Sequence, residues 1–416
     1  MSEPRSKPFD ISKRLVWEAY RKVAANKGAA GVDGESIQQF EEDLKGNLYK
    51  LWNRLSSGSY FPPPVRAVEI PKKAGGVRIL GVPTVADRIA QTVVCMVLEP
   101  EVEPMFHEDS YGYRPGRSAH DALAVTRRRC WENDWVIDLD IKSFFDTIDH
   151  ELLMQAVERH TNLRWVVLYV RRWLAAPMQH ADGTVTRRDR GSPQGSAISP
   201  LLANLFLHYA FDAWMSRTYP DVTFERYCDD MVVHCRSKTQ AVFIRDMIGA
   251  RLAACGLELH PENTCLVYCK DSGRPDSQEY EQFTFLGYTF RPRLAKSRKH
   301  GTFFVSFSPA VSQDNLVRIR RVIRGWRLHR RSDMTFREII TYVNKHAAGW
   351  VAYYGRFYKS ELYAAFTGLN EFLVKWAMRK YKTLKRRKKQ AWAWLIGIAK
   401  RYPLLFAHWR LGAVPT

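Results

Sequence analysis

Acidic residues inside two short apolar segments constrain the fold of this chain more than any other feature. In WVIDLDIKSFFDTIDH (residues 135–150) the first seven residues alternate, so apolar side chains face one side of a strand while Asp138 and Asp140 face the other. A strand interior disfavours Asp, so each acid needs a partner, either a basic side chain or a divalent cation. The residues that follow are interpreted as structural, at a helix start: Asp146, Thr147 and Asp149.

The second acidic segment is FERYCDDMVVHC, residues 224–235. It predicts a hairpin with Cys228, Asp229 and Asp230 at the bend. Acids are common in turns, which alone would explain the pair. If the chain also brings the other acidic strand close, carboxylates about 4 Å apart repel by roughly 4 kcal/mol at an effective dielectric near 20. Paired divalent ions would relieve that repulsion.

Two further segments carry residues suited to a nucleotide. Residues 65–82 predict two strands joined by a Gly-Gly turn, with Arg66, Lys72 and Arg78 spaced to embrace a triphosphate. The Gly- and Pro-rich turn of RGSPQGSAISP leaves Gln194 uncrowded, so it can reach a base or ribose. A solvated hairpin and an exposed turn are the alternatives for each segment taken alone.

Positive charge gathers in the last third of the chain. Residues 291–416 hold 28 Lys and Arg against 5 Asp and Glu, although the whole chain has a net charge of +21. The apolar residues between the basic clusters recur at helical spacing, which predicts a helical domain with basic ridges that binds nucleic acid. The expected RNA-binding residues are Arg320, Arg321, Arg324, Lys385, Arg386, Arg387, Lys388 and Lys389.

Composition excludes several other classes of protein. Seven scattered cysteines without a CxxC pair support neither a disulfide framework nor a zinc ribbon. The N-terminal residues lack the apolar core of a secretory signal, and no apolar run is long enough to span a bilayer. We therefore expect no membrane association and a location in the cytoplasm.

An acidic strand, an acidic hairpin, a cationic hairpin and a basic module together describe a template-dependent polymerase. Their order resembles the group II intron-encoded reverse transcriptase and maturase family over nearly the whole chain. The matching blocks are NKGAAGVDGESIQQF, PPPVRAVEIPKKAGGVRILGVPTVADRIAQ, SYGYRPGRSAHDAL, DLDIKSFFDTIDH, GSPQGSAISPLLANLFLHY, RYCDDMVV, GLELHPENT, FTFLGYTF, AAGWVAYYGRF and LLFAHWRLG.

The resemblance implies an α+β right-hand polymerase: fingers and an antiparallel-sheet palm in residues 1–290, then a basic α-helical thumb or maturase domain in residues 291–416. It implies catalytic and metal-binding roles for Asp140, Asp229 and Asp230, with the carbonyl of Ile141 as a further metal ligand, whereas Asp138 resembles a neighbour without that role. Nucleotide binding is implied for Arg66, Lys72, Arg78, Phe145 and Gln194, and a one-residue shift would put Phe144 in place of Phe145 as the aromatic that rejects a ribose 2′-OH.

The expected cofactor is a pair of Mg²⁺ ions, with Mn²⁺ as a substitute. The expected partners are a group II intron RNA, an RNA template with a DNA primer and deoxynucleoside triphosphates, with the protein a monomer or homodimer. The sequence departs from the family pattern in two places: Cys228 stands where Ala is more usual, and His260 with Asn263 stand in place of the more usual Asn and Lys. No Cys- and His-rich endonuclease is expected, so mobility would use existing DNA 3′ ends.

Three functions are compatible with the sequence. The favoured one is a bifunctional intron protein that promotes splicing of its RNA and copies it into DNA for retrohoming. The second is an intron-independent, domesticated reverse transcriptase in DNA repair or phage defence. The third is a non-catalytic RNA-binding splicing factor, which predicts eroded acids; all three expected acids are present.

Overall fold

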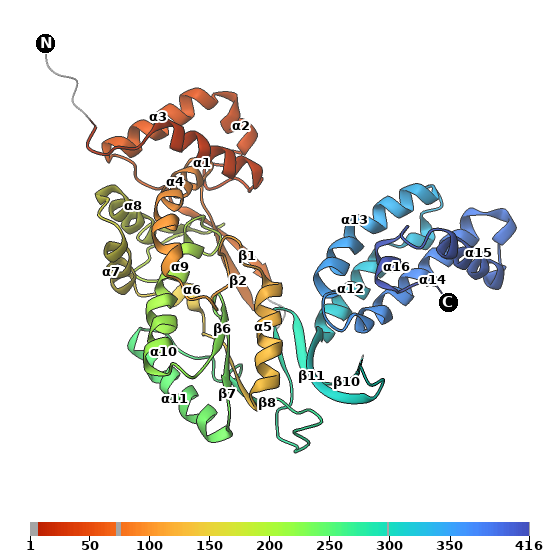
Figure 1. Ribbon diagram of the computed structural model, residues 1–416. Coiled ribbons are helices and arrows are strands. Elements are labelled where there is room, and N and C mark those ends of the chain that lie inside the picture. Colours follow the sequence, from red (N-terminus) through yellow and green to blue (C-terminus); the bar gives the residue numbers. More distant parts are fainter. Residues whose placement is uncertain (1–6, 72–75, 298, 416) are drawn as a thin grey trace, which may run out of the picture. The chain divides into compact units, whose positions relative to one another are not determined.

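The computed structural model describes residues 7–71, 76–297 and 299–415 (Figure 1), so Lys72 lies outside the described residues. The chain divides into two compact units, each assembled from separate stretches of sequence. The first comprises Met1–Ser118, Leu139–Met231 and Val242–Thr264, and the second comprises Ala119–Asp138, Val232–Ala241 and Cys265–Thr416. The functional boundary expected between residues 290 and 291 stays a prediction.

Helices dominate the first unit. Several begin at side-chain caps: Ser36 and Gln39 form a capping box at α2, and the Asp149 carboxylate accepts a hydrogen bond from the Leu152 amide at the start of α7, as the capping interpretation predicted. The helices are α1 (Lys13–Ala25), α2 (Ile37–Glu42), α3 (Leu44–Ser57), α4 (Val85–Val102), η1 (Glu103–Met105), α6 (Phe144–Thr147), α7 (His150–His160), α8 (Arg164–Leu174), α9 (Ser199–Leu207), η2 (His208–Asp212) and α10 (Ala213–Thr218), with α11 (Lys238–Ala254) crossing into it from the second unit.

The predicted cationic hairpin is present in the first unit. Strands β1 (Val65–Pro71) and β2 (Val77–Val82) pair antiparallel and join β4 (Met178–Gln179) and β5 (Val185–Thr186) in a sheet of order β2-β1-β4-β5. Arg66 lies opposite Val82 and Ile70 opposite Arg78. Because side chains alternate along a strand, Arg66 and Arg78 lie on the same face of the hairpin.

The predicted acidic strands belong to one four-stranded sheet. Its order is β6-β7-β3-β8, formed by β6 (Phe224–Tyr227), β7 (Asp230–Cys235), β3 (Trp135–Leu139) and β8 (Cys265–Tyr268). β6 and β7 are the arms of the expected hairpin, with Asp230 already in the second arm. Asp140 follows directly after the end of β3.

The second unit corrects the expectation that the basic region is helical from residue 291. β10 (Tyr288–Lys296) and β11 (Phe303–Val311) pair along nine residues each, and β9 (Phe283–Phe285) adds a third strand. Aromatic and β-branched residues in FFVSFSPAV favour the strand despite the neighbouring basic residues.

Helices follow from Gln313, and Figure 1 shows them gathered in the blue part of the ribbon. They are α12 (Gln313–Gly325), η3 (Leu328–Arg330), α13 (Phe336–Tyr354), η4 (Lys359–Leu362), α14 (Tyr363–Lys380), η5 (Lys382–Leu384), α15 (Lys388–Arg401) and α16 (Ala407–Leu411), and α5 (Ala119–Glu132) joins this unit from earlier in the chain. Their core is aromatic: the Trp326 and Trp350 rings stack at 5.7 Å, and Trp376 is fully buried.

Two observations on the described residues bear on the composition-based predictions. All seven cysteines are free, as expected from their spacing. No described helix is both long and apolar enough to cross a membrane.

Candidate active site

An open cleft of about 920 Å³ collects most of the predicted active-site residues of the first unit. Its walls come from β2, residues 140–146, residues 186–194, and Asp229 with His260 and Asn263. The cleft therefore brings together Asp140, Asp229, Arg78, Phe145 and Gln194, which are far apart in sequence.

Asp140 is fixed on both its backbone and its side chain. Its carbonyl accepts a hydrogen bond of 2.7 Å from the His260 amide, and its Oδ2 accepts one of 2.6 Å from Asn263 Nδ2. Ile141, the predicted backbone ligand, is buried and forms an isolated bridge with Leu259. The segment carrying His260 and Asn263 thus orients the first of the predicted catalytic acids, a contact that their sequence alone did not reveal.

The hairpin bend holds the other two acids in a constrained backbone. Cys228 is buried and has φ 61°, in the left-handed region that costs free energy for residues other than glycine. Burial, followed by the neighbouring Asp229 carboxylate, raises the pKa of the Cys228 thiol, so the thiol stays protonated at neutral pH.

The pKa of Asp230 depends on the charges of the other two acids. Part of its surface meets solvent, yet the surrounding protein removes enough water to raise its pKa, and the charges of Asp229 and Asp140 raise it further, to about 7. Both other carboxylates are therefore close enough to repel the charge of Asp230. No basic side chain is among the causes that shift the pKa of Asp230, although Arg78, Lys142 and Arg188 line the same cleft as Asp140 and Asp229.

This donor set fits a divalent metal. Carboxylates are the oxygen ligands that Mg²⁺ prefers, together with substrate phosphates, and a bound cation would remove the repulsion that raises the pKa of Asp230. Within residues 7–71, 76–297 and 299–415, no group of three or more His, Cys, Asp or Glu side chains already forms a metal cage. Asn263 donates to Oδ2 of Asp140, and the second carboxylate oxygen of Asp140 could serve as a metal ligand while that hydrogen bond is kept.

Arg78 and Gln194 are joined directly. Arg78 Nε donates to Gln194 Oε1, and the Gly81 amide donates to the Gln194 carbonyl at 2.7 Å. Gly195 has φ 108°, and a Cβ there would lie 2.8 Å from the Gly81 carbonyl oxygen, so the close approach of the loop to β2 requires glycine. The predicted nucleotide-binding cation and amide therefore act as one unit.

The other predicted nucleotide-binding residues differ in position. Phe145 and Phe144 are both buried, both line the cleft and pack edge to face at 5.3 Å, so either ring could stand against a ribose. Arg66 is not among the residues lining the cleft, and its Nε is buried without a hydrogen-bond partner in the described part of the chain. Asp138 lies opposite Cys265 in the sheet and is likewise absent from the cleft lining.

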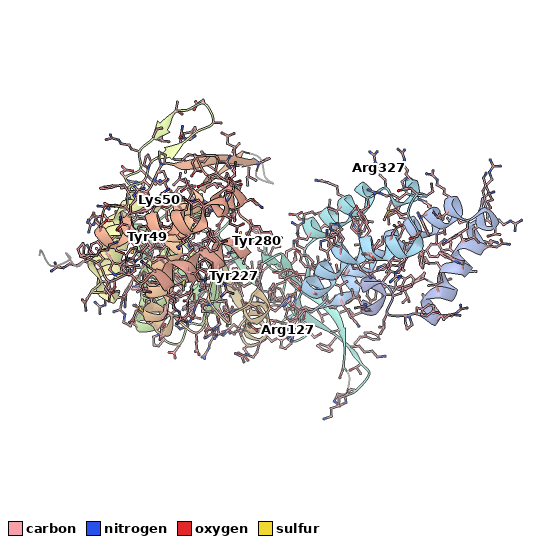
Figure 2. All side chains as sticks on the ribbon, turned by 90° about the horizontal axis from the view of Figure 1, so that it is seen from above. Tyr49, Lys50, Arg127, Tyr227, Tyr280 and Arg327 are labelled. Carbon is pink, nitrogen blue, oxygen red and sulfur yellow. The ribbon has the colours of Figure 1, made fainter. Side chains whose placement is uncertain are left out.

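The predicted RNA-binding residues lie in the second unit. Arg320 is half-buried on α12, whereas Arg321 and Arg324 are exposed, and the residues from Lys385 to Lys389 are all exposed. Figure 2 shows long side chains extending outward from the helices of this unit, including the labelled Arg327. A recess of about 620 Å³ is lined by His329, Lys375, Met378, Arg379, Lys380, Tyr381, Lys382, Lys385 and Arg386, none of them acidic.

A cleft of clustered acids beside a cationic hairpin, on an α+β fold with an antiparallel sheet, defines the class of nucleotidyl-transferring polymerases. The comparisons identify the family. Residues 70–290 match the family described as Reverse transcriptase (RNA-dependent DNA polymerase), and residues 316–394 match the family described as Group II intron, maturase-specific domain. The chain belongs to the group II intron-encoded reverse transcriptase and maturase family, as its motifs predicted, and is an RNA-directed DNA polymerase.

Two curated relatives illustrate the range of the similarity. Protein YkfC of Escherichia coli (strain K12) is 34% identical over 323 residues, which cover 68% of this chain and 80% of that protein. Group II intron-encoded protein LtrA of Lactococcus lactis subsp. cremoris is 34% identical over 197 residues, covering 47% of this chain. The match spans only 32% of LtrA's own length.

Among solved structures, telomerase from Candida albicans in complex with a fragment of telomeric RNA aligns with a TM-score of 0.48 and 11% identity. That alignment covers 91% of this chain and 68% of the telomerase chain. The family assignment does not rest on this alignment.

Proposed function

We propose that this protein copies RNA into DNA by metal-assisted nucleotidyl transfer and binds a group II intron RNA, promoting its splicing and retrohoming. The observation that carries the catalytic part is that Asp140 and Asp229 line one cleft, with Asp230 next to Asp229 in the chain and repelled by both carboxylates. Carboxylates gathered in this way are expected where a divalent cation brought with the substrate phosphates completes the site.

The residues of the cleft have separate tasks in this proposal. Asp140, Asp229 and Asp230 would hold two Mg²⁺ ions, which supply activation of the primer 3′-hydroxyl and neutralisation of the leaving pyrophosphate. Arg78 and Gln194 would bind the incoming deoxynucleoside triphosphate. A phosphate-binding task for Arg66, which does not line the cleft, and for Lys72, which lies outside the described residues, rests on the family resemblance alone. Phe145 or Phe144 would select against a ribose 2′-hydroxyl by packing where that group would lie.

Replacement of Asp229 tests the catalytic proposal. We expect Asp229→Ala to reduce Mg²⁺-dependent extension of a DNA primer on an RNA template about 1,000-fold or more, because it removes a carboxylate that holds charge in the transition state. RNA affinity, measured by filter binding, should stay within about twofold, since the basic residues of the second unit are untouched.

Asp221→Ala is the matched control, because Asp221 is an exposed acid of the same unit and is absent from the cleft lining. Extension should be unaffected by this change. Extension by Asp229→Ala at the rate of the control would refute the assignment of the acids.

The intron-binding part of the proposal rests on the maturase-specific match over residues 316–394 and the basic recess near Lys385 and Arg386. Sequencing RNA that copurifies with the protein should yield one enriched structured RNA. An RNA population matching the cellular background would instead favour an intron-independent reverse transcriptase.

A further inference from the structure

A buried arginine lies directly behind the acidic turn. Arg226, on β6, has a fully buried side chain, and so has Asp212, whose carboxylate it meets in a two-point ion pair. Arg226 Nε donates to Asp212 Oδ1 at 2.7 Å and Nη2 donates to Oδ2 at 2.6 Å. This geometry fixes the plane of the guanidinium group.

The remaining guanidinium nitrogen reaches the turn itself. Arg226 Nη1 donates to the Cys228 carbonyl at 3.1 Å and to Asn204 Oδ1 at 3.0 Å. Cys228 is the residue in the left-handed conformation, immediately before Asp229. A backbone held in that region persists only where surrounding contacts enforce it, and this hydrogen bond is such a contact.

Asn204 links Arg226 to a second segment that contacts the turn, at Gly112. Its Nδ2 donates to the Gly112 carbonyl at 2.7 Å, and it is buried in α9. A Cβ on Gly112 would lie 2.5 Å from the Cys228 amide nitrogen, so Gly112 packs against the backbone of the turn. The turn is therefore held at the Cys228 carbonyl by Arg226 and at the Cys228 amide by Gly112, with Asn204 bridging the two.

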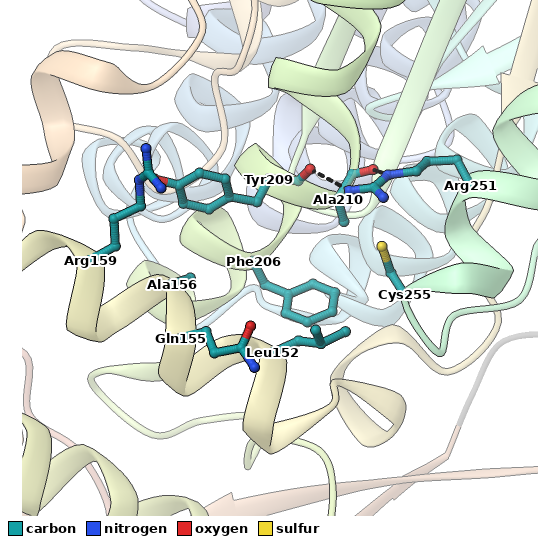
Figure 3. Close-up of a pocket in the computed structure, with 9 residues that line it drawn as sticks. All are labelled: Leu152, Gln155, Ala156, Arg159, Phe206, Tyr209, Ala210, Arg251 and Cys255. Atoms are coloured by element: carbon teal, nitrogen blue, oxygen red, sulfur yellow. Dashed lines mark hydrogen bonds between the residues drawn. The ribbon is translucent and has the colours of Figure 1, made fainter.

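The position of Asp212 depends on an irregular helix. Asp212 ends η2, a π-helical turn of His208–Asp212, a distortion that is frequent at functional sites. Arg251 of α11 donates to the Tyr209 carbonyl at 3.0 Å and to the Ala210 carbonyl at 3.1 Å. Figure 3 shows both hydrogen bonds beside a cavity lined by Phe206, Tyr209 and Cys255.

We propose that Arg226 and Asp212 are positioning residues for polymerisation: Asp212 orients the Arg226 guanidinium, which anchors the Cys228 carbonyl and thereby fixes the backbone that carries Asp230 and the cleft-lining Asp229. Every residue of this network lies in the first unit. The kinetic consequence rests on the proposed polymerase function, whereas the structural consequence can be measured without activity.

Arg226→Lys tests the proposal because lysine keeps a positive charge beside Asp212 but cannot also reach both the Cys228 carbonyl and Asn204. We expect amide hydrogen exchange across residues 228–231 to increase about tenfold. We also expect kcat for primer extension to fall about 100-fold, because a small displacement of a catalytic group from its reactive position has an effect of that size. The affinity for the RNA–DNA template–primer should be unchanged.

Arg274→Lys is the control for replacing an arginine that joins a carboxylate to backbone carbonyls elsewhere in the chain. Arg274 lies in the second unit, pairs with Asp271 and donates to the Asn133 and Cys130 carbonyls, far in sequence from the turn. It should lower the melting temperature without changing exchange at residues 228–231 or kcat. If Arg226→Lys gave the same exchange and kcat as this control, the positioning role would be refuted.

Asp212→Asn provides a test if Arg226→Lys does not fold, because it keeps the size of the side chain while removing the charge that holds the Arg226 guanidinium in its plane. Faster exchange at residues 228–231 together with a lower kcat supports the proposal, and values equal to wild type overturn it.

The double variant Asp212→Asn with Arg226→Lys should have the same kcat as Arg226→Lys alone, because both changes break the same connection from Asp212 through Arg226 to the Cys228 carbonyl. Additive losses of kcat would contradict the proposal. Loss of kcat by Asp229→Ala with no effect of either Asp212→Asn or Arg226→Lys would refute the positioning role and leave the proposed function standing.

Discussion

Asp87 is a buried acid whose hydrogen bonds lead through Gln91 to the loop that carries Gln194. Its Oδ1 accepts hydrogen bonds of 2.7 Å from the Tyr60 hydroxyl and from Trp173 Nε1, and its Oδ2 accepts one from Gln91 Nε2. Gln91 Oε1 in turn accepts from the Ser196 hydroxyl and the Ala197 amide, close to Gln194. One carboxylate thus links α4 to the loop that carries a predicted substrate-binding residue.

The pKa of Asp87 predicts how this support responds to pH. Burial raises it from 3.8 to about 6, even though its hydrogen-bond donors act in the opposite direction. Between these values the folded protein keeps a proton that the unfolded chain has released, so the contribution of Asp87 to stability falls as pH rises. The free energy of unfolding of wild type relative to that of Asp87→Asn should therefore decrease by about 2 kcal/mol between pH 4 and pH 7.

Urea denaturation of both proteins across this pH range measures the difference. Tyr60→Phe removes a donor that lowers the pKa of Asp87, so in that variant the decline should move to higher pH. If the difference in free energy of unfolding between wild type and Asp87→Asn stayed constant from pH 4 to pH 7, Asp87 would have the same proton occupancy in the folded and unfolded states.

At the scale of single residues, the sequence predicts acids better than the groups that orient them. Alternation placed Asp138 and Asp140 on one strand face, but only the structure shows that Asp140 reaches the cleft. Asn263 and Arg226 act through hydrogen bonds with residues distant in sequence. No local sequence pattern predicts which residues form these hydrogen bonds. His260 and Asn263 nevertheless differ from the residues that are usual in the family, which singles out their segment.

Elements with alternating or turn-bounded patterns were predicted correctly, as for the hairpins at residues 65–82 and 224–235. The strands at 288–296 and 303–311 were missed because the density of basic charge favoured a helical domain. Pairing along nine residues stabilises those strands, and strand propensity depends strongly on such context.

Packing of the 110–114 segment against the acidic hairpin leads to an element-scale prediction. Because a Cβ on Gly112 would lie 2.5 Å from the Cys228 nitrogen and 3.0 Å from the Tyr227 carbonyl carbon, Gly112→Ala must displace the hairpin backbone. We expect a loss of about 1–3 kcal/mol in stability and a larger proportional loss of primer extension. Thermal melting and single-turnover extension measure the two effects.

Gly349→Ala is the matched control, since Gly349 lies within α13 with open space around its Cβ position. Alanine in a helix interior should raise stability by up to about 1 kcal/mol and leave extension unchanged. Equal behaviour of the two variants would show that the hairpin tolerates displacement.

At the scale of the whole molecule, the charge distribution predicted a basic module but not how the units are assembled. Residues 119–138 and 232–241 belong with the C-terminal part of the chain. This interleaving arises from contacts between segments more than 100 residues apart, such as the hydrogen bond from Trp131 Nε1 to the Phe307 carbonyl. Sequence periodicity reports only local structure and cannot specify such contacts.

The basic cluster at residues 386–389 provides a prediction for the RNA-binding surface as a whole. Lys388 and Lys389 lie in the first turn of α15, where positive charge opposes the helix dipole and where the structure shows no acid. Folding therefore does not favour these charges, so their removal should not unfold the domain. Neutralising Arg386, Arg387, Lys388 and Lys389 should weaken RNA binding and reduce the slope of log affinity against log salt by about 0.7 to 0.9 for each phosphate that the protein no longer neutralises.

Exchanging arginine and lysine at the same four positions keeps the net charge and provides the control. Because counterion release depends on the phosphates neutralised, this variant should keep the wild-type slope, while the neutral variant should show a flatter one in filter binding from about 50 to 200 mM salt. The kcat of the neutral variant at saturating RNA should match that of wild type, since the cleft that holds the proposed catalytic acids lies in the first unit. If neutralisation left the slope unchanged, the cluster would be a solvated surface and the RNA would bind to other basic residues.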